Sequence, residues 1–152
     1  MPSKAYTSAG TQLLISEQLP ADTTISDFDL VAFTEVGEVS DIAEFGSSAE
    51  VLTYYALGSN VPEKSLGNLS VGNLTLTMAA VRDDTGQAII QQARRDRQRC
   101  SFQIITSDPD VYYFTGLISD YSVSIGGPDQ IVSASVTIAL DSEFVVDSDI
   151  FI

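Results

Sequence analysis

Gln130-Ile131-Val132-Ser133-Ala134-Ser135-Val136-Thr137-Ile138-Ala139-Leu140-Asp141 is the stretch that decides the fold of this chain. Apolar residues occupy every second position from Val132 to Leu140, and mostly small or hydroxyl-bearing residues stand between them. Because successive side chains of a strand point to opposite faces, this alternation predicts a strand with one buried face. Gly72–Val81 alternates in the same way and predicts a second such strand, with Leu74–Ala80 as its apolar face.

Shorter apolar runs predict further strands. These lie at Gln12–Ser16, Phe28–Val36, Val51–Leu57, Ser101–Thr106 and Val111–Ser124. The last run is long and holds Gly116, which indicates a bulge or a bend. Ile125–Gln130 contains the turn residues Gly126-Gly127-Pro128-Asp129, so it is expected to join the last two strands as an antiparallel hairpin.

Two stretches lack this alternation and are expected to be long loops. Val36–Glu50 is acidic and contains glycine, and Gly58–Asn73 carries Pro62 and Gly67. Long loops within a domain are usually functional or disordered. Both stretches are therefore candidates for contacts with other molecules.

One segment follows a helical pattern instead. Asp83-Asp84-Thr85-Gly86-Gln87 can cap the start of a helix, and arginines near its end suit the helix dipole. A helical wheel extended to Cys100 has an apolar side formed by Ile89, Ala93 and Cys100. The opposite side is formed by Arg94, Arg95 and Arg99, and Arg97 flanks the apolar stripe. The sequence thus predicts an α+β fold, mostly antiparallel, with one amphipathic helix docked on a sheet.

The length of 152 residues fits a single domain over 1–152, with residues 1–9 and 142–152 as terminal arms. Apolar residues make up 44% of the chain, enough for a hydrophobic core. No apolar run reaches the roughly 18 residues of a membrane helix, so no membrane partner is expected. Met1-Pro2-Ser3-Lys4 does not resemble the start of a signal peptide, so we expect synthesis in the cytoplasm.

The net charge of −14 is unevenly distributed. Ten acidic residues and no basic one lie between Ala5 and Glu63, and eight acidic residues and no basic one lie from Cys100 to Ile152. All five arginines lie between Arg82 and Arg99. Such a chain repels nucleic acid at long range. The acidic charge has two interpretations. The general one is that it keeps the protein soluble; the more specific one is that it lets a surface lie near DNA without binding it.

Residues for catalysis are scarce. The chain has no histidine, which excludes Ser-His-Asp and Cys-His catalysis. Its single cysteine, Cys100, is expected to be a buried, inert thiol. Lys64-Ser65 lacks the glycines of a phosphate loop, and the acidic Asp141-Ser142-Glu143 lacks the spacing of a calcium loop. We therefore expect no catalytic residue, metal or cofactor; a hydrolase that uses paired carboxylates is the weaker alternative.

The arginine cluster has three interpretations. Contact between subunits is favoured, because arginine is enriched at interfaces and the rest of the chain offers acidic partners. A solvated helix face is the second interpretation. Nucleic-acid binding is the third, and it is disfavoured because no aromatic residue stands among the arginines to stack on bases.

Taken in order, these segments resemble the tail tube (major tail) proteins of phages with long, non-contractile tails. The similarity covers roughly residues 9–141. It rests on the N-terminal strand near Ala9–Ile15, on Glu63-Lys64-Ser65-Leu66-Gly67 before a strand and on a final hairpin rich in serine and threonine. Its strongest parts are Phe33–Ile42, which is similar to an "evG.v.di" stretch, and Arg82–Gln87, which is similar to a "D-D-x-G-Q" helix entry.

The resemblance implies a β-sandwich or barrel-like domain flanked by one helix. It also implies six copies in a ring, rings stacked into a tube, and DNA passing through the lumen without specific binding. The implied location is the virion, and the implied partners are other copies and the tape measure, terminator and distal tail proteins. A tail-completion or terminator protein, which forms a single ring, is the main alternative.

Candidate contact residues follow from this expectation. The intersubunit helix candidates are Arg94, Arg95, Arg97 and Arg99. Inter-ring candidates are both termini and two segments, Gly37–Gly46 and Gly58–Gly72, with the named residues Gly37, Glu38, Asp41, Glu44, Gly58, Pro62, Glu63, Lys64 and Gly67. Two faces compete for the lumen: a hydroxyl-rich one (Thr75, Thr77, Ser133, Ser135, Thr137) and acidic positions such as Glu35, Glu38, Asp41 and Glu44.

Overall fold

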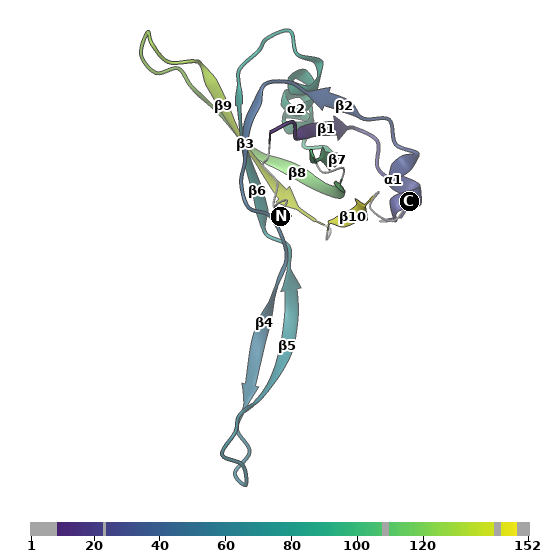
Figure 1. The fold of residues 1–152 in the computed structure, drawn as a ribbon, viewed down its shortest axis with the longest axis vertical. Helices are drawn as coiled ribbons and strands as arrows, with labels where there is room; N and C mark the ends of the chain where they lie inside the picture. The colour runs from purple at the N-terminus through teal and green to yellow at the C-terminus, as the bar shows by residue number, and fades with distance from the viewer. Residues whose placement is uncertain (1–8, 23, 108–109, 142–143, 149–152) are drawn as a thin grey trace, which may run out of the picture.

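A curled antiparallel sheet with a projecting hairpin forms this protein in the computed structural model, which describes residues 9–22, 24–107, 110–141 and 144–148 (Figure 1). Its elements are β1 (Gln12–Ser16), α1 (Ile25–Asp29), β2 (Thr34–Val36), β3 (Val39–Ile42), β4 (Ser48–Tyr54), β5 (Glu63–Ser70), β6 (Asn73–Ala79), α2 (Thr85–Asp96), β7 (Arg99–Ile105), β8 (Asp110–Ser124), β9 (Ser133–Leu140) and β10 (Val145–Ser148). The large sheet has the order β2-β1-β7-β8-β9-β6-β3, β10 also pairs with β8, and β4 and β5 pair with each other.

The two alternating strands pair and bury their apolar faces, as predicted. In β6 and β9, Leu76 lies opposite Val136, and both side chains are fully buried. The predicted faces are too long at one end, because β6 stops at Ala79 and β9 starts at Ser133. Ala80 and Val132 lie beyond these ends, where the chain leaves the sheet, and are exposed.

The long strand β8 makes the sheet curl. Its first half pairs with β7 and β10 and its second half pairs with β9, with an irregularity between Ile118 and Asp120 that confirms the predicted bulge or bend. Both halves contribute to one apolar cluster. The curl is strong enough that Thr11, just before β1, lines one hollow together with β3 at the far end of the strand order. The predicted Ile125–Gln130 connection joins β8 to β9 as an antiparallel hairpin.

The predicted strand Phe28–Val36 is wrong in its first part. Thr24 caps a short helix, α1, by accepting a hydrogen bond from the Asp27 amide at Oγ1 (3.3 Å). Phe28 is fully buried and stacks on Tyr113 with ring centroids 5.0 Å apart. Tertiary packing on β8 thus overrides the strand propensity of this run, and only Thr34–Val36 becomes a strand.

The predicted helix is confirmed as α2, and its expected apolar side is right at Ile89 and Ala93, which pack on the core, but wrong at Cys100. Arg97 adopts a left-handed conformation (φ 54°) and ends the helix, so Arg99 and Cys100 belong to β7. The side chains that α2 buries are Gln87, Ile90 and Ala93. A wheel extended past Arg97 joined two elements whose geometries differ.

The two predicted loops contain β3, β5 and the first three residues of β4. β3 lies in the first stretch, β5 lies in the second, and β4 spans Ser48–Tyr54 instead of Val51–Leu57. β4 and β5 are exposed on both faces except at Ala49 and Gly67. The prediction therefore found β4 with shifted bounds but missed β5, because a strand exposed on both faces carries no alternation of apolar and polar residues.

The two stretches that carry the resemblance contact each other. The backbone N–H of Gly37 donates to Asp84 Oδ2 (3.1 Å), and this oxygen also accepts from the backbone N–H of Gln87 (3.0 Å). The buried side chain of Gln87 donates from Nε2 to the carbonyl oxygens of Gly37 (3.0 Å) and Ala79 (2.9 Å). Its Oε1 accepts from the backbone N–H of Val81 (3.0 Å). A Cβ on Gly86 would lie 2.4 Å from the Glu35 carbonyl oxygen. These residues fasten the start of α2 to the turn between β2 and β3.

The terminal arms lie partly outside the described residues. This applies to residues 1–8 of the N-terminal arm and to 142–143 and 149–152 of the C-terminal arm. Within the latter, Val145–Ser148 forms β10 and pairs with the start of β8.

Candidate assembly surfaces

The most exposed apolar surface is the hairpin β4–β5, which runs away from the body of the molecule (Figure 1). Val51 (56% exposed) lies opposite Leu66 (73% exposed) on one face. Leu52 and Tyr54 alternate with Val51 and therefore lie on the other face. The tip between the strands adds Tyr55, Leu57 and Val61, all exposed. We call β4, β5 and this tip the projecting hairpin; it presents apolar side chains on both faces.

The predicted inter-ring residues separate into two groups. Gly58 and Pro62 lie in the tip, and Glu63, Lys64 and Gly67 lie in β5, so these five belong to the projecting hairpin. The other four precede it in the chain: Gly37 and Glu38 form the turn between β2 and β3, Asp41 lies in β3, and Glu44 lies in the link from β3 to the projecting hairpin. Glu38 has φ 61°, a left-handed conformation that shapes the turn.

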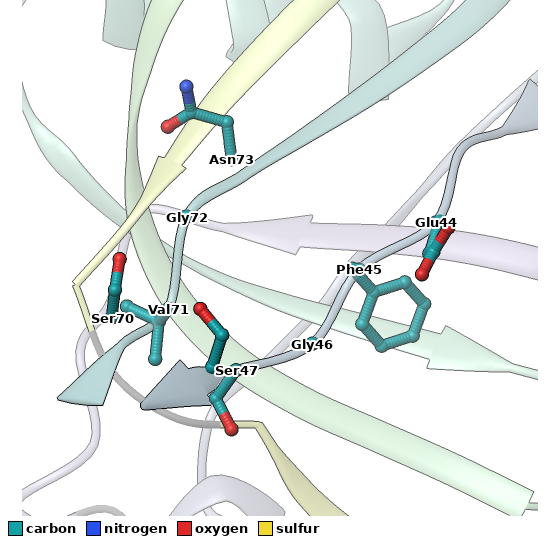
Figure 2. A pocket seen from close by; sticks show the side chains of 9 residues that line it. Glu44, Phe45, Gly46, Ser47, Ser70, Val71, Gly72 and Asn73 are labelled. Atoms are coloured by element: carbon teal, nitrogen blue, oxygen red, sulfur yellow. The ribbon is translucent and has the colours of Figure 1, made fainter. Parts of the chain in front are cut away.

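An open hollow of about 330 Å³ marks the base of the projecting hairpin (Figure 2). Figure 2 shows the two linking segments, Glu44–Ser47 and Ser70–Asn73, around it. Phe45 anchors the first link, because its ring meets Tyr112 and Phe144 edge to face, each with centroids 5.5 Å apart. The lining offers serine hydroxyls, an asparagine and one carboxylate, so we regard the hollow as the root of the hairpin and assign it no chemistry.

The hydroxyl-rich lumen candidates share one side of the sheet. Thr75 and Thr77 of β6 lie opposite Thr137 and Ser135 of β9, and Ser133 continues the same face. The next strand extends the rows with Asp120, Ser122 and Ser124, and Asp41 of β3 lies opposite Thr77. We call this non-core side of β3, β6, β9 and the second half of β8 the hydroxyl-rich face.

The acidic lumen candidates do not form a second face. Asp41 joins the hydroxyl-rich face, so the two predicted options coincide at this residue. Glu35 lies in β2, opposite Leu14 and at the other end of the strand order, so it does not share a sheet face with Asp41, although the turn Gly37–Glu38 links β2 directly to β3.

The four candidate arginines are divided between α2, its C-cap and β7, which corrects their placement on one helix. Arg94 and Arg95 lie in the last turn of α2, and Arg97 is its C-cap. With Ile118 and Ser119 of β8, these three line an open hollow of about 360 Å³, which we call the basic hollow. Arg99 lies in β7 and forms an ion pair with Asp141 of the same chain.

Reactive groups are sparse in the part of the chain that the structure describes. Cys100 is fully buried, as predicted, and burial together with the charge of Glu17 raises the pKa of its thiol to about 11. The thiol is therefore protonated and unreactive near neutral pH. Among the described residues no group of three or more histidine, cysteine or acidic side chains is placed to hold a metal ion. Nor does any described helix have the length and apolar character needed to cross a membrane.

Comparison with known proteins places this fold. No protein-family model and no curated protein matches the sequence. Solved structures do match in three dimensions. A chain of the anti-feeding prophage baseplate, solved with 6-fold symmetrisation, has a TM-score of 0.67 at 9% identity and covers 97% of this chain and 98% of its own. The SPP1 tail tube protein has a TM-score of 0.60 at 14% identity, covering 92% and 77%.

A third structure, the sheath/tube terminator of an extracellular contractile injection system, has a TM-score of 0.63 at 9% identity and covers 96% of this chain and all of its own (100%). The class defined by these neighbours is that of tail tube and tube-terminating proteins of phage-like particles. The chain has the fold of these proteins, which confirms the resemblance inferred from the sequence at the level of the fold.

Proposed function

We propose that this protein is a non-enzymatic structural subunit of a phage-type tail tube, in which copies close into rings and rings stack. The observation that carries the proposal is the projecting hairpin. An isolated two-stranded hairpin is marginally stable in water, and contiguous exposed apolar surface marks an interaction site. Because apolar side chains lie on both faces, a neighbouring molecule must cover them. Contact with the next ring would provide that cover.

Two sheet edges support closure into a ring. In the described chain, β3 pairs only with β6, and the second half of β8 pairs only with β9. Unpaired edges invite pairing with another chain, and a closed barrel removes them. If the β8 edge of one copy joins the β3 edge of the next, the hydroxyl-rich face becomes the inner wall of a continuous barrel. Six copies is the proposed number, since a structural neighbour was solved with 6-fold symmetrisation.

The chemistry of the hydroxyl-rich face suits a DNA conduit. Its described side chains are hydroxyls, small residues, the carboxamide of Asn73 and the carboxylates of Asp41 and Asp120, and none is a lysine or an arginine. Phosphate binding depends on cations, so a wall of this kind would let DNA pass without holding it. We accordingly place the protein in the virion, after synthesis in a host bacterium, beside tape measure, terminator and distal tail proteins.

A tube terminator is the second candidate, because one structural neighbour bears that description. It would form a single ring and would not stack. Negative-stain microscopy of the purified protein at rising concentration separates the two. Stacked tubes are the expected result, single rings would favour the terminator, and monomers at every concentration would contradict both.

The hairpin tip provides a sharper test. Leu57→Ser with Val61→Ser removes exposed apolar groups from the tip, so we expect normal folding and rings that no longer stack into tubes. Leu30→Ser is the control, because Leu30 is 83% exposed but follows α1 on the body. Circular dichroism checks the fold, and sedimentation with microscopy measures stacking. Tubes of wild-type length from the double variant would refute the role of the tip.

A further inference from the structure

The basic hollow holds cations that have no acidic partner among the residues that the structure describes. The protein has 21 acidic residues and 7 lysines and arginines, so an arginine could readily find a carboxylate. In the described part of the chain the one ion pair is Arg99 with Asp141. Arg94, Arg95 and Arg97 instead surround an open space. Three guanidinium groups kept together repel one another, so their arrangement favours an anionic partner from outside the chain.

The position of the basic hollow points to the side where a neighbour would dock. Arg94 and Arg95 also line a smaller space with Gln91 and Tyr121, and the Gln91 side chain donates to the Tyr121 hydroxyl (3.0 Å). Ile118, Ser119 and Tyr121 belong to the half of β8 that β7 does not reach, because β7 pairs with β8 only as far as Leu117. The arginines therefore flank the open edge of β8.

The other open edge carries the opposite charge. Glu38 precedes β3, Asp41 lies within it and Glu44 follows it, and all three side chains are exposed. No lysine or arginine lies between Ala5 and Glu63 to neutralise them locally. The open edge of β8 is thus flanked by basic side chains, and the open edge of β3 carries acidic ones.

We propose that the basic hollow binds the acidic β3 edge of a second copy of this chain, in the segment Glu38–Glu44. The proposal rests on ring closure as proposed above, and it names the side chains that select the partner edge. A head-to-tail ring needs two different, complementary surfaces on one chain, and these edges supply them. Like edges would repel, so the charges would also prevent β8–β8 and β3–β3 pairing, which would not close a ring.

Two charge-reversed variants test this pairing. The acid-substituted variant carries Arg94→Glu and Arg95→Glu; the base-substituted variant carries Glu38→Lys and Glu44→Lys, because the Asp41 side chain lies on the hydroxyl-rich face, on the other side of the sheet from α2. Each then has two edges of the same sign, so each alone should need a roughly 10-fold or higher concentration to assemble. Arg82→Glu is the matched control: Arg82 precedes α2, at the end away from the basic hollow, and its reversal should leave assembly unchanged.

Mixing the two variants gives the decisive result. An acidic β8 edge then meets a basic β3 edge, and a basic β8 edge meets an acidic β3 edge, so equal amounts should form alternating rings with wild-type assembly restored. Light scattering and microscopy measure assembly, and circular dichroism confirms that each variant is folded. Either variant assembling alone like the wild type, or folded variants failing to assemble when mixed, would overturn the proposal.

The same proteins distinguish other outcomes. If the wild type never forms rings, the proposed function fails before this inference is tested. If wild-type rings form and the acid-substituted variant also forms them but loses binding to labelled double-stranded DNA, the basic hollow is a nucleic-acid site and the pairing is overturned. The pairing is supported if the wild type and the Arg82→Glu control assemble equally and only the two charge-reversed variants, each alone, lose assembly.

Discussion

At the residue scale, Gln87 connects parts of the chain that are distant in sequence. Its side chain is 1% exposed and bonds to the turn after β2, to the last residue of β6 and to the segment that leads into α2. We expect Gln87→Leu to lower the free energy of unfolding by about 2–4 kcal/mol, because three backbone groups lose their partners. Urea unfolding of the unassembled protein measures this loss.

Gln92→Leu is the control, because Gln92 is exposed on the same helix and bonds only to Asp96 (2.9 Å) among its described partners. Its cost should stay within about 0.5 kcal/mol. Equal costs for the two variants would show that the Gln87 bonds do not stabilise the fold.

At the element scale, the two faces of β9 have different roles. Val136 is fully buried in the core, whereas Ser135, its neighbour in sequence, lies on the hydroxyl-rich face opposite Thr77 and Ser122. Val136→Asp would bury an unpaired carboxyl group and should cost about 3 kcal/mol or more. Ser135→Asp places the same group on the open side and should cost less than about 1 kcal/mol. Thermal unfolding of both variants checks the assignment, and a soluble, normally stable Val136→Asp protein would contradict it.

The elements differ in how far the sequence revealed them. Strands with one buried face, such as β6 and β9, and the capped helix α2 carry a periodic signal and were predicted. The projecting hairpin has no buried face, and α1 owes its place to Phe28 packing on Tyr113. Of these elements the sequence predicted only part of β4, within Val51–Leu57; β5 and α1 lack a periodic signal, because contacts with distant residues or with other molecules decide them.

At the scale of the whole molecule, the hydroxyl-rich face should become the wall of a channel. The thiol introduced by Ser135→Cys is then expected to react with a small maleimide both before assembly and in the assembled tube. It should react with a bulky polyethylene-glycol maleimide only before assembly. Cys100 adds little background, because it is buried and the pKa of its thiol is raised to about 11.

Gln92→Cys is the matched position for this labelling, since Gln92 is exposed on α2, whose buried residues face the core from the other side of the sheet. It should react with both reagents in both states. Rapid labelling of Ser135→Cys by the bulky reagent in intact tubes would exclude this face as the channel wall.

The sequence by itself determined the alternating core strands, the single amphipathic helix, the inert cysteine and the segregation of charge, because each depends on residues close together in the chain. Only the tertiary structure decided which surfaces exist. It separated Arg99 from the helix by the left-handed turn at Arg97, paired it with Asp141, and gathered Asp41 with the serines and threonines of three other strands. Strand register and chain reversal set these neighbours, and both arise from long-range packing that no local pattern encodes.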